Sequence, residues 1–562
     1  MSTTLPEPET EAQLEQLPEQ SADGHPKEDL SLLEDRVPVE FQASTSMVAW
    51  GIGFGLLFAI FSYLPIWHTD VWGHLAYGRV ILETGRIPQT EPLLPLCEGV
   101  KFDDTAWLTQ VVTALAVKQW GVNAIRCLFA LCLTGSLMLL AWRFWKSTSN
   151  HLLSLAGTVG FLWAGWLSLT IQRPQSAGLF CFMALFCLLT SSKRSWKSVL
   201  LCAVLMAFWV NLHGSFLVGL GLIGLMLFGH GIDVYFRTGR LDAVWKNSQL
   251  HYLVYCLEAA LVGCLINPYG LGIFSIVQEI SSNLNLRDLV EWGPITLSMY
   301  HGKAIALLVL LVIGMIRFSP RRLKIAEILP LTIFTLAALS SVRMAVWCMP
   351  LLIWFLVRHG NALWKQYHLS DVVYENGERS GLKTVVLGGV VWIFFAFTPF
   401  GTVLMHGQPA KAEMAEKLYR KSLSTQTPVK AVEYLNEHPP QGMVFNTYEW
   451  GDYLLWAGPK EMQLFLNSHA HLIPREVWQD YLHTVRAGSA WADKLDRYGI
   501  DTVIVDYRMH DRLIRRLKRE GLQDWTHDYD DGTAAIFRRR RPVTRGAEPP
   551  VTSSDSSSAN SH

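Results

Sequence analysis

Long apolar segments recur along the chain from residue 46 to residue 404, with shorter polar stretches between them. A helix that crosses a bilayer needs about 20 mostly apolar residues, and this criterion predicts about eleven membrane-spanning helices. The predicted spans lie near residues 47–67, 122–142, 152–171, 176–190, 199–210, 215–229, 250–266, 304–316, 325–339, 344–357 and 384–404. We therefore expect residues 46–404 to form the membrane domain of a mainly α-helical, polytopic membrane protein.

The pattern changes after residue 404 and stays different up to residue 540. Short apolar segments near residues 442–446, 458–467, 497–506 and 533–539 predict strands, whereas residues 427–438, 475–485 and 512–519 predict helices. Alternating strands and helices are typical of a small layered α/β domain. We expect one such domain over residues 405–540.

The two ends of the chain differ from both of these regions. Residues 1–45 are rich in Glu, Pro, Gln and Ser, and residues 541–562 are also polar and rich in Ser. Such compositions predict disordered tails. The first tail lacks the basic start and the closely following apolar core of a cleavable signal peptide. We expect it to lie in the cytoplasm.

Basic residues predict the orientation, because cytoplasmic loops of membrane proteins carry an excess of Lys and Arg. When the N-terminus is placed inside, every basic cluster falls on the inner side: Arg143 and Lys146; Lys193, Arg194 and Lys197; Arg237, Arg240 and Lys246; Arg317, Arg321, Arg322 and Lys324; Arg358, Lys365, Arg379 and Lys383. An odd number of spans then places the C-terminal α/β domain outside the cytoplasm. The expected location is the inner (cytoplasmic) membrane.

Composition supports a membrane protein and excludes some partners. The 562 residues are 50% hydrophobic and 17% charged, whereas soluble proteins carry about a quarter charged residues. The formal net charge is zero, so there is no basic footprint for nucleic acid. None of the nine Cys lies beyond residue 348, and no spacing typical of a zinc site occurs. The bilayer is the expected partner.

Polar residues gather in the predicted outer loops, the largest of which covers residues 67–120. Asp70 lies within about one helical turn of the first span, with Trp72 and His74 close behind, and Asp103 and Asp104 follow in the same loop. The other outer loops contribute Arg173, His213, Asn267, Tyr269, Glu291 and Arg343. Carboxylates, imidazoles, amides and guanidinium groups on one face predict a site at the outer membrane boundary.

Each of these residues also has a structural interpretation. Asp70 is a suitable N-cap for a helix that starts at Val71, and Asp103 or Asp104 is suitable for a helix over residues 106–118. Arg173 and Arg343 are long enough to reach lipid headgroups. His213 fits an interhelical hydrogen bond, and the segment from Asn267 to Tyr269 has the composition of a turn. The residues alone leave these alternatives open.

The first outer loop carries a motif that resembles a known family. The pattern is D-x-W-x-H-L-x-x-G-x-x-I-x-x-x-G-x-I-P, formed by Asp70, Trp72, His74, Leu75, Gly78, Ile81, Gly85, Ile87 and Pro88. It resembles bacterial GT-C superfamily membrane glycosyltransferases. The Arg-Pro pair at residue 173, the NPYG segment at residue 267 and the stretches 444–456 and 467–481 resemble the same group.

This resemblance implies transfer of a sugar from a polyprenyl-phosphate carrier to a glycan, lipid or protein acceptor. The essential acid of the family corresponds to Asp70, which would act as the general base, and a second carboxylate corresponds to Asp103 or Asp104. The chain departs from the family in lacking a strict D-x-D motif at Asp70, which is followed by Val71 and Trp72. The departure leaves the metal ligands unknown, with Mg²⁺ or Mn²⁺ as the candidate cofactor.

The residues fit this chemistry independently of the resemblance. A carboxylate at the membrane surface is placed to accept a proton from an attacking hydroxyl. The planar forks of Arg173 and Arg343 suit a leaving phosphate. His74 and His213 have the chemistry to position substrates, and Trp72 offers a flat surface for a sugar ring.

Two further functions remain open at this point. A transporter would show repeated halves and ionisable residues near the middle of its spans. The sequence shows no corresponding halves and few charges deep in its spans, of which Glu258 is the clearest. A non-catalytic assembly protein would use its outer domain to bind a partner. Its candidate contacts are Tyr448, Glu449, Trp450, Asp452, His469 and His471.

Overall fold

The computed structural model describes residues 38, 41–68, 70–367, 380–408 and 412–541. Most of the predicted tail over residues 1–45, and nearly all of the tail over residues 541–562, lie outside these ranges. The chain divides into two compact units. One comprises Met1–Ile52 with Tyr374–Val390, and the other comprises Gly53–Val373 with Val391–His562.

The first unit holds the start of helix α1 (Thr45–Tyr63) and most of helix α16 (Gly381–Ala396). Within this unit the hydroxyl of Thr384 donates to the carbonyl oxygen of Phe41 at 2.7 Å and accepts from the amide of Ala43 at 2.9 Å. A β-bridge joins Ala43 to Ser380. These bonds tie the residues that precede α1 to the start of α16.

Each of the eleven predicted spans coincides with a helix. Besides α1 and α16 these are α4 (Asn123–Thr148), α5 (His151–Leu169), α6 (Gln175–Thr190), α7 (Trp196–Leu212), α8 (Phe216–Thr238), α10 (Ser248–Cys264), α13 (Tyr300–Phe318), α14 (Ile325–Ser340) and α15 (Ala345–Gln366). Within the described ranges, six helices are long and apolar enough to cross a membrane: α1, α4, α5, α8, α13 and the stretch Val342–Gln366 that contains α15. The chain is thus an integral, multi-pass membrane protein, and the count of eleven spans stays a prediction.

The last predicted span, over residues 384–404, is broken. Helix α16 ends at Ala396, and helix α17 (Pro399–His406) continues at an angle of 91° to it. The hydroxyl of Thr398 caps α17 by accepting a hydrogen bond from the amide of Gly401 at 3.0 Å. Pro399 follows at the first helical position, where a missing amide hydrogen costs nothing. A local cap and a proline therefore divide one apolar run into two helices.

The connection between α1 and α4 contains two helices, α2 (Asp70–Thr84) and α3 (Trp107–Trp120), and the short 3₁₀ turn η3 (Pro95–Cys97). Helix α2 ends at Gly85, whose φ of +68° lies in the left-handed region that glycine adopts readily. Helix α3 begins after Ala106 without a side-chain cap. The expected cap from Asp103 or Asp104 is therefore wrong. Asp104 instead accepts from the amide of Ala106 at 2.8 Å, in a turn before the helix.

The C-terminal domain is built on one five-stranded sheet in the order β2-β1-β3-β5-β4. Its strands are β1 (Met443–Asn446), β2 (Gln463–Leu464), β3 (Ile500–Asp506), β4 (Trp525–Asp530) and β5 (Ala534–Arg539). β1 pairs in parallel with β2 and β3, whereas β5 pairs antiparallel with β3 and β4. The α/β class is as predicted, although β2 is much shorter than the segment 458–467 and β4 was not predicted.

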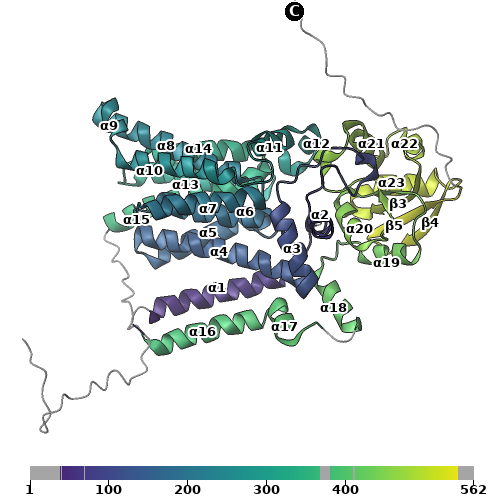
Figure 1. Cartoon of the computed structure of the whole chain (residues 1–562), viewed down its shortest axis with the longest axis horizontal. Helices are drawn as coiled ribbons and strands as arrows, with labels where there is room; N and C mark the ends of the chain where they lie inside the picture. The colour runs from purple at the N-terminus through teal and green to yellow at the C-terminus, as the bar shows by residue number, and fades with distance from the viewer. Residues whose placement is uncertain (1–37, 39–40, 69, 368–379, 409–411, 542–562) are drawn as a thin grey trace, which may run out of the picture. The chain divides into compact units, whose positions relative to one another are not determined.

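Helices surround this sheet (Figure 1). They are α19 (Val429–Glu437), α20 (Gly451–Ala457), α21 (Arg475–Val485), α22 (Trp491–Arg497) and α23 (Tyr507–Arg519), whereas α18 (Ala412–Ser422) precedes them and lies next to α17 in Figure 1. The core of the domain also includes Val71, Trp72 and Leu75 of α2, which pack with Trp450 and Tyr453. Helix α2, which precedes the boundary predicted at residue 405, thus shares one hydrophobic core with the C-terminal domain.

Candidate functional site

Helix α2 presents two chemically different faces. Its apolar residues Val71, Trp72 and Leu75 are buried in the core shared with the C-terminal domain. Another face of the helix carries Asp70 and the residues three, four and seven positions after it, which are Gly73, His74 and Tyr77. The carboxylate at the first position is also favoured by the positive end of the helix dipole. The polar face of α2 is the element around which the candidate site is built.

Asp70 begins a chain of ion pairs that links four connections of the membrane domain. Its Oδ2 lies 3.7 Å from Nε of Arg173, and Nη1 of Arg173 donates to Oε2 of Glu291 at 2.8 Å. Nη1 of Arg343 donates to the other oxygen of Glu291 at 3.2 Å, and its guanidinium lies 4.6 Å from the ring centre of Trp292. One carboxylate therefore bridges two guanidinium groups, and a second carboxylate lies beside them.

His68 joins this chain of charges from the other side of Asp70. Nη2 of Arg173 lies 3.0 Å from Nε2 of His68, and Nδ1 of His68 lies 3.1 Å from Oδ1 of Asp70. Because a guanidinium nitrogen only donates, Nε2 of His68 accepts from Arg173. His68 thus contacts Asp70 with one ring nitrogen and Arg173 with the other.

The charges of the cluster reinforce one another. Burial alone would raise the pKa of Asp70, but His68 and Arg173 hold it well below its ordinary value. Burial acts in the same way on Glu291, whose pKa is nevertheless lowered by Arg343 and Arg173. Burial would lower the pKa of Arg173, yet Glu291 and Asp70 raise it. These shifts favour the ionised forms of Asp70 and Glu291 and the charged form of Arg173 at neutral pH.

A second polar group lies behind His74. The side-chain amide of Gln110 donates to Nδ1 of His74 at 3.2 Å and to Oδ1 of Asp104 at 3.1 Å. The backbone amide of Asp104 donates to the hydroxyl of Tyr269 at 2.8 Å. Burial lowers the pKa of His74 to about 4 and raises that of Asp104 to about 7. Asp104 therefore supports His74 through Gln110, and its Oδ2 is buried without a hydrogen bond among the described residues.

The C-terminal domain covers the polar face of α2 with its own polar residues. A Cβ on Gly73 would lie 2.4 Å from Oδ1 of Asp452, so this carboxyl group rests directly on the helix backbone. The ring of His469 lies edge-on to His74, with 5.7 Å between the ring centres. Burial, and then the charge of Asp70, raise the pKa of Asp452 well above its ordinary value. Both effects favour the protonated form of Asp452.

Two of these groups carry polar atoms without a partner. Oδ2 of Asp452 and Nδ1 of His469 are buried and form no hydrogen bond within the described residues. Tyr448 lies nearby and donates from its hydroxyl to the carbonyl oxygen of Ser468 at 2.8 Å. The segments proposed above as contacts for a separate partner thus include residues that contact α2 within the same chain.

Not every residue predicted for the site lies in its polar centre. Trp72 is fully buried, with its ring 5.4 Å from that of Tyr453 and 6.1 Å from that of Trp456, so it packs between domains. Asp103 forms an ion pair at 2.8 Å with the exposed Lys101. Asn267 donates to the carbonyl oxygens of Cys264 and Gly270 and so closes a turn.

His213 lies at the C-cap of α7, and Nδ1 of its ring is 2.8 Å from the hydroxyl of Ser215. Burial, followed by the positive charge of Arg343, lowers its pKa to about 3. His213 therefore belongs to the surroundings of the arginine cluster as a neutral imidazole. Its hydrogen bond is local, and the interhelical bond considered above is not observed for Nδ1.

The described residues contain no group of three or more His, Cys, Asp or Glu side chains that could hold a metal ion. Asp70 and Glu291 both face guanidinium groups, which occupy the oxygens that a divalent cation would need. A site for Mg²⁺ or Mn²⁺ made of these side chains alone does not fit the arrangement. The positive charge at the site is supplied by Arg173 and Arg343.

Among solved structures, the chain is similar to ArnT from Cupriavidus metallidurans bound to undecaprenyl phosphate, with 12% identity and a TM-score of 0.48 over 88% of this chain and 98% of that chain. It is also similar to the Archaeoglobus fulgidus oligosaccharyltransferase tethered with an acceptor peptide, with 10% identity and a TM-score of 0.49 over 88% and 74%. Both are GT-C superfamily membrane glycosyltransferases. The motif that starts at Asp70 resembles the same superfamily. No family model and no curated protein sequence matches the chain.

Three residues of the cluster were not among the predicted site residues: His68, Asp452 and His469. His68 is two residues from Asp70, so its proximity was visible in the sequence, although its bond to Arg173 was not. Asp452 and His469 reach the site only because the C-terminal domain packs on α2. The sequence feature that could have indicated Asp452 and His469 is the polar content of the segments 448–452 and 467–471, which lie in an otherwise apolar domain core.

Proposed function

We propose that the chain is a membrane glycosyltransferase that transfers a sugar from a polyprenyl-phosphate donor to an acceptor hydroxyl on the outer face of the inner membrane. Asp70 is the general base, and Arg173 with Arg343 binds the donor phosphate. The observation that carries this proposal is the ionised Asp70 lying 3.7 Å from a buried guanidinium that also reaches Glu291. A proton acceptor and an anion site are thereby adjacent.

The arrangement suits a single displacement at the anomeric carbon. The acceptor oxygen forms the new bond to this carbon while the bond from the carbon to the phosphate oxygen breaks. The acceptor proton passes to Asp70, and the electron pair of the broken bond stays on the phosphate, which Arg173 and Arg343 stabilise. A direct displacement of this kind inverts the configuration of the sugar.

Arg173 also adjusts the strength of the base. In the absence of substrate, His68 and then Arg173 hold the pKa of Asp70 low, which makes the carboxylate a weak proton acceptor. A phosphate bound at Arg173 would bring negative charge next to Asp70 and raise its pKa. The Nε atom of Arg173 has no hydrogen bond among the described residues and is free to donate to such a ligand. Donor binding would therefore activate the base.

The C-terminal domain supplies the other half of the proposed site. Asp452 is protonated and His469 has its pKa lowered by burial, so both groups are neutral. Neutral hydrogen-bonding groups suit the hydroxyls of an acceptor, whereas the two arginines suit an anion. The polar cluster lies between helix ends and this domain, and a transporter would instead place its ionisable groups near the middle of its spans.

Replacement of Asp70 by Asn tests the proposal. General-base catalysis contributes about 10²–10⁴-fold, and we expect at least this loss of transfer. The measurement is mass spectrometry of glycolipids and glycans from cells that carry the wild-type gene, the variant or no gene. Glu98→Gln, an exposed acid in the same connection, is the matched control and should keep full activity. Full transfer by a folded Asp70→Asn protein would show that the assignment is wrong.

A further inference from the structure

Helix α18 (Ala412–Ser422) joins the membrane domain to the C-terminal domain, and its inner side is tied to the core. The ring of Tyr419 lies 6.5 Å from Trp72, and its hydroxyl is 3.2 Å from that of Tyr453. The side chain of Ser422 is buried as well. Tyr419 therefore fixes which side of α18 faces the protein.

The end of α18 is attached close to the end of a membrane-spanning helix. The amide of Ile66 donates to the carbonyl oxygen of Ser422 at 2.8 Å, and the amide of Ser424 donates back to Ile66 at 2.9 Å. Ile66 comes three residues after Tyr63, where α1 ends. Because each residue extends the chain by about 3.5 Å at most, Ile66 lies within about 10 Å of the end of α1, and Ser422 is hydrogen-bonded to it.

The chain before α18 also leaves the membrane domain nearby. Helix α17, the second half of the bent apolar pair, ends at His406. Gln408 follows and lies against Gly121, where an added Cβ would be 2.6 Å from its Nε2. Gly121 lies two residues before the long apolar helix α4 begins. The segments on both sides of α18 are thus fixed at ends of apolar helices, which places α18 at the level of the bilayer surface.

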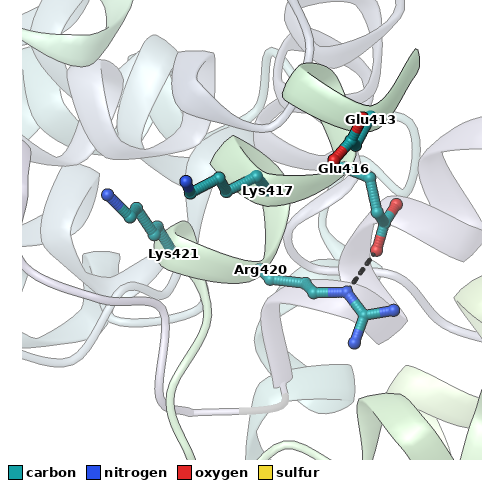
Figure 2. Close-up of a pocket in the computed structure, with 5 residues that line it drawn as sticks. All are labelled: Glu413, Glu416, Lys417, Arg420 and Lys421. Atoms are coloured by element: carbon teal, nitrogen blue, oxygen red, sulfur yellow. Dashed lines mark hydrogen bonds and ion pairs between the residues drawn. The ribbon is translucent and has the colours of Figure 1, made fainter.

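The outer side of α18 combines apolar and cationic residues. Met414 and Leu418 are 50% and 39% exposed, and Lys417 and Lys421 are exposed as well. The four positions follow at spacings of three, four and seven residues and therefore share one face. Figure 2 shows the surface hollow along this helix, with Lys417 and Lys421 extending to the same side.

Three other charged residues of α18, Glu413, Glu416 and Arg420, line the same hollow as the two lysines. Arg420 forms ion pairs with Glu416 and with Glu433 of α19. Figure 2 shows the pair of Glu416 and Arg420 on the side away from the lysines. Glu413 lies in the first turn, where the helix dipole favours an acid. Neither Lys417 nor Lys421 has an ion-pair partner in the part of the chain that the structure describes.

We propose that α18 lies on the membrane surface and binds anionic phospholipid headgroups through Lys417 and Lys421, with Met414 and Leu418 inserted between the lipids. An amphipathic helix with apolar residues and lysines on one face is the type of element that lies in the membrane interface. Unpaired lysines complement the charge of a lipid phosphate. The apolar spans at both ends of the helix make the bilayer the occupant that is already adjacent.

This contact would link the lipid composition to the core beneath the site. Tyr419 on the inner side of α18 touches Tyr453 and Trp72, and Trp72 belongs to the same helix as Asp70. A helix held on anionic lipid would therefore keep the C-terminal domain seated on α2. The lipid contact itself does not depend on the reaction that we propose for Asp70.

Hydrogen exchange of the full-length protein in nanodiscs tests the contact. Discs of phosphatidylcholine are compared with discs that also contain phosphatidylglycerol. A lysine near an anionic surface contributes about 1 kcal/mol, which is about fivefold in an equilibrium. We expect amides of residues 413–422 to exchange several-fold more slowly in the anionic discs. The Lys417→Gln/Lys421→Gln variant should lose this difference while exchange in β3 is unchanged.

Lys430→Gln/Lys460→Gln is the matched control, because both lysines are exposed and lie outside α18. It should keep the difference between the two kinds of disc. Met414→Gln/Leu418→Gln should raise exchange of α18 in both. The proposal would be overturned if the wild-type helix exchanged equally in the two kinds of disc. It would also be overturned if the difference between the discs survived in Lys417→Gln/Lys421→Gln. In either case α18 would be a surface for another protein or a simple linker.

Discussion

The contact between Gly73 and Asp452 gives a sharp test of how the C-terminal domain meets α2. An alanine Cβ at position 73 would lie 2.4 Å from Oδ1, 2.7 Å from Cγ and 3.2 Å from Oδ2 of Asp452. Ordinary contacts between carbon and oxygen begin at about 3.3 Å, so one of the two elements must move by about 0.9 Å. Asp452 is fully buried, which leaves its short side chain little room to move.

The expected change in stability on Gly73→Ala follows from two opposing contributions. Overpacking a buried contact costs about 1–3 kcal/mol, whereas alanine favours a helix over glycine by about 1 kcal/mol. We expect Gly73→Ala to destabilise the protein by up to about 2 kcal/mol. In the Asp452→Ala background the carboxyl group is gone, so the same substitution should become stabilising by up to about 1 kcal/mol. The sign of the effect should thus reverse.

Thermal unfolding of the four proteins in the same detergent, at one scan rate, measures this double-mutant cycle. The apparent melting temperature should fall for Gly73→Ala and rise for the same change in the Asp452→Ala background. Gly85→Ala is not a suitable control because its φ is positive, but Gly53, where an added Cβ meets nothing within 4 Å, is suitable. Equal effects of Gly73→Ala in both backgrounds would refute the docking of Asp452 on α2.

Two further predictions concern the charged groups. Arg173→Lys keeps the positive charge but loses the guanidinium fork that reaches Glu291 and His68 together. We expect kcat/KM for the polyprenyl-phosphate donor, measured in nanodiscs, to fall by about tenfold or more. Unchanged kinetics would contradict the role of the fork. The pKa of Asp104 is raised by burial from 3.8 to about 7, so the native state binds more protons than the unfolded state in this window, and stability falls as pH rises. The melting temperature of Asp104→Asn relative to wild type should therefore rise from pH 4 to pH 7, and a constant difference would disprove the shift.

The helices of the membrane domain were predictable because their signal is local. Apolar runs of sufficient length coincide with α4, α5, α8 and α13 to within a few residues at most ends. The break at Thr398 and Pro399 also has a local cause, since a capping residue and a proline stand together in the sequence. It was missed because apolar length alone predicted a single span over residues 384–404.

The candidate site was predictable in part, for a related reason. Asp70 starts α2, Arg173 and Arg343 stand just before α6 and α15, and Glu291 lies in the connection that leads to α13. Connections on one side of a bundle of spanning helices converge at one level. Residue type and position relative to the spans are therefore enough to predict that these four lie together. No local pattern indicates, however, that His68 accepts from Arg173, because that bond depends on how the connection before α2 packs on the one before α6.

The contribution of the C-terminal domain depends on contacts between distant parts of the chain. Asn467 donates to the hydroxyl of Tyr77 across 390 residues of sequence, and this hydroxyl in turn donates to Glu91. Gly73 allows the approach because its missing side chain lets Asp452 rest on the helix backbone. A glycine in the middle of α2 costs helix stability, and the fold retains it where a carboxyl group needs the space. Such a glycine, three residues after an acid at a helix start, marks a face on which another part of the chain is to be expected.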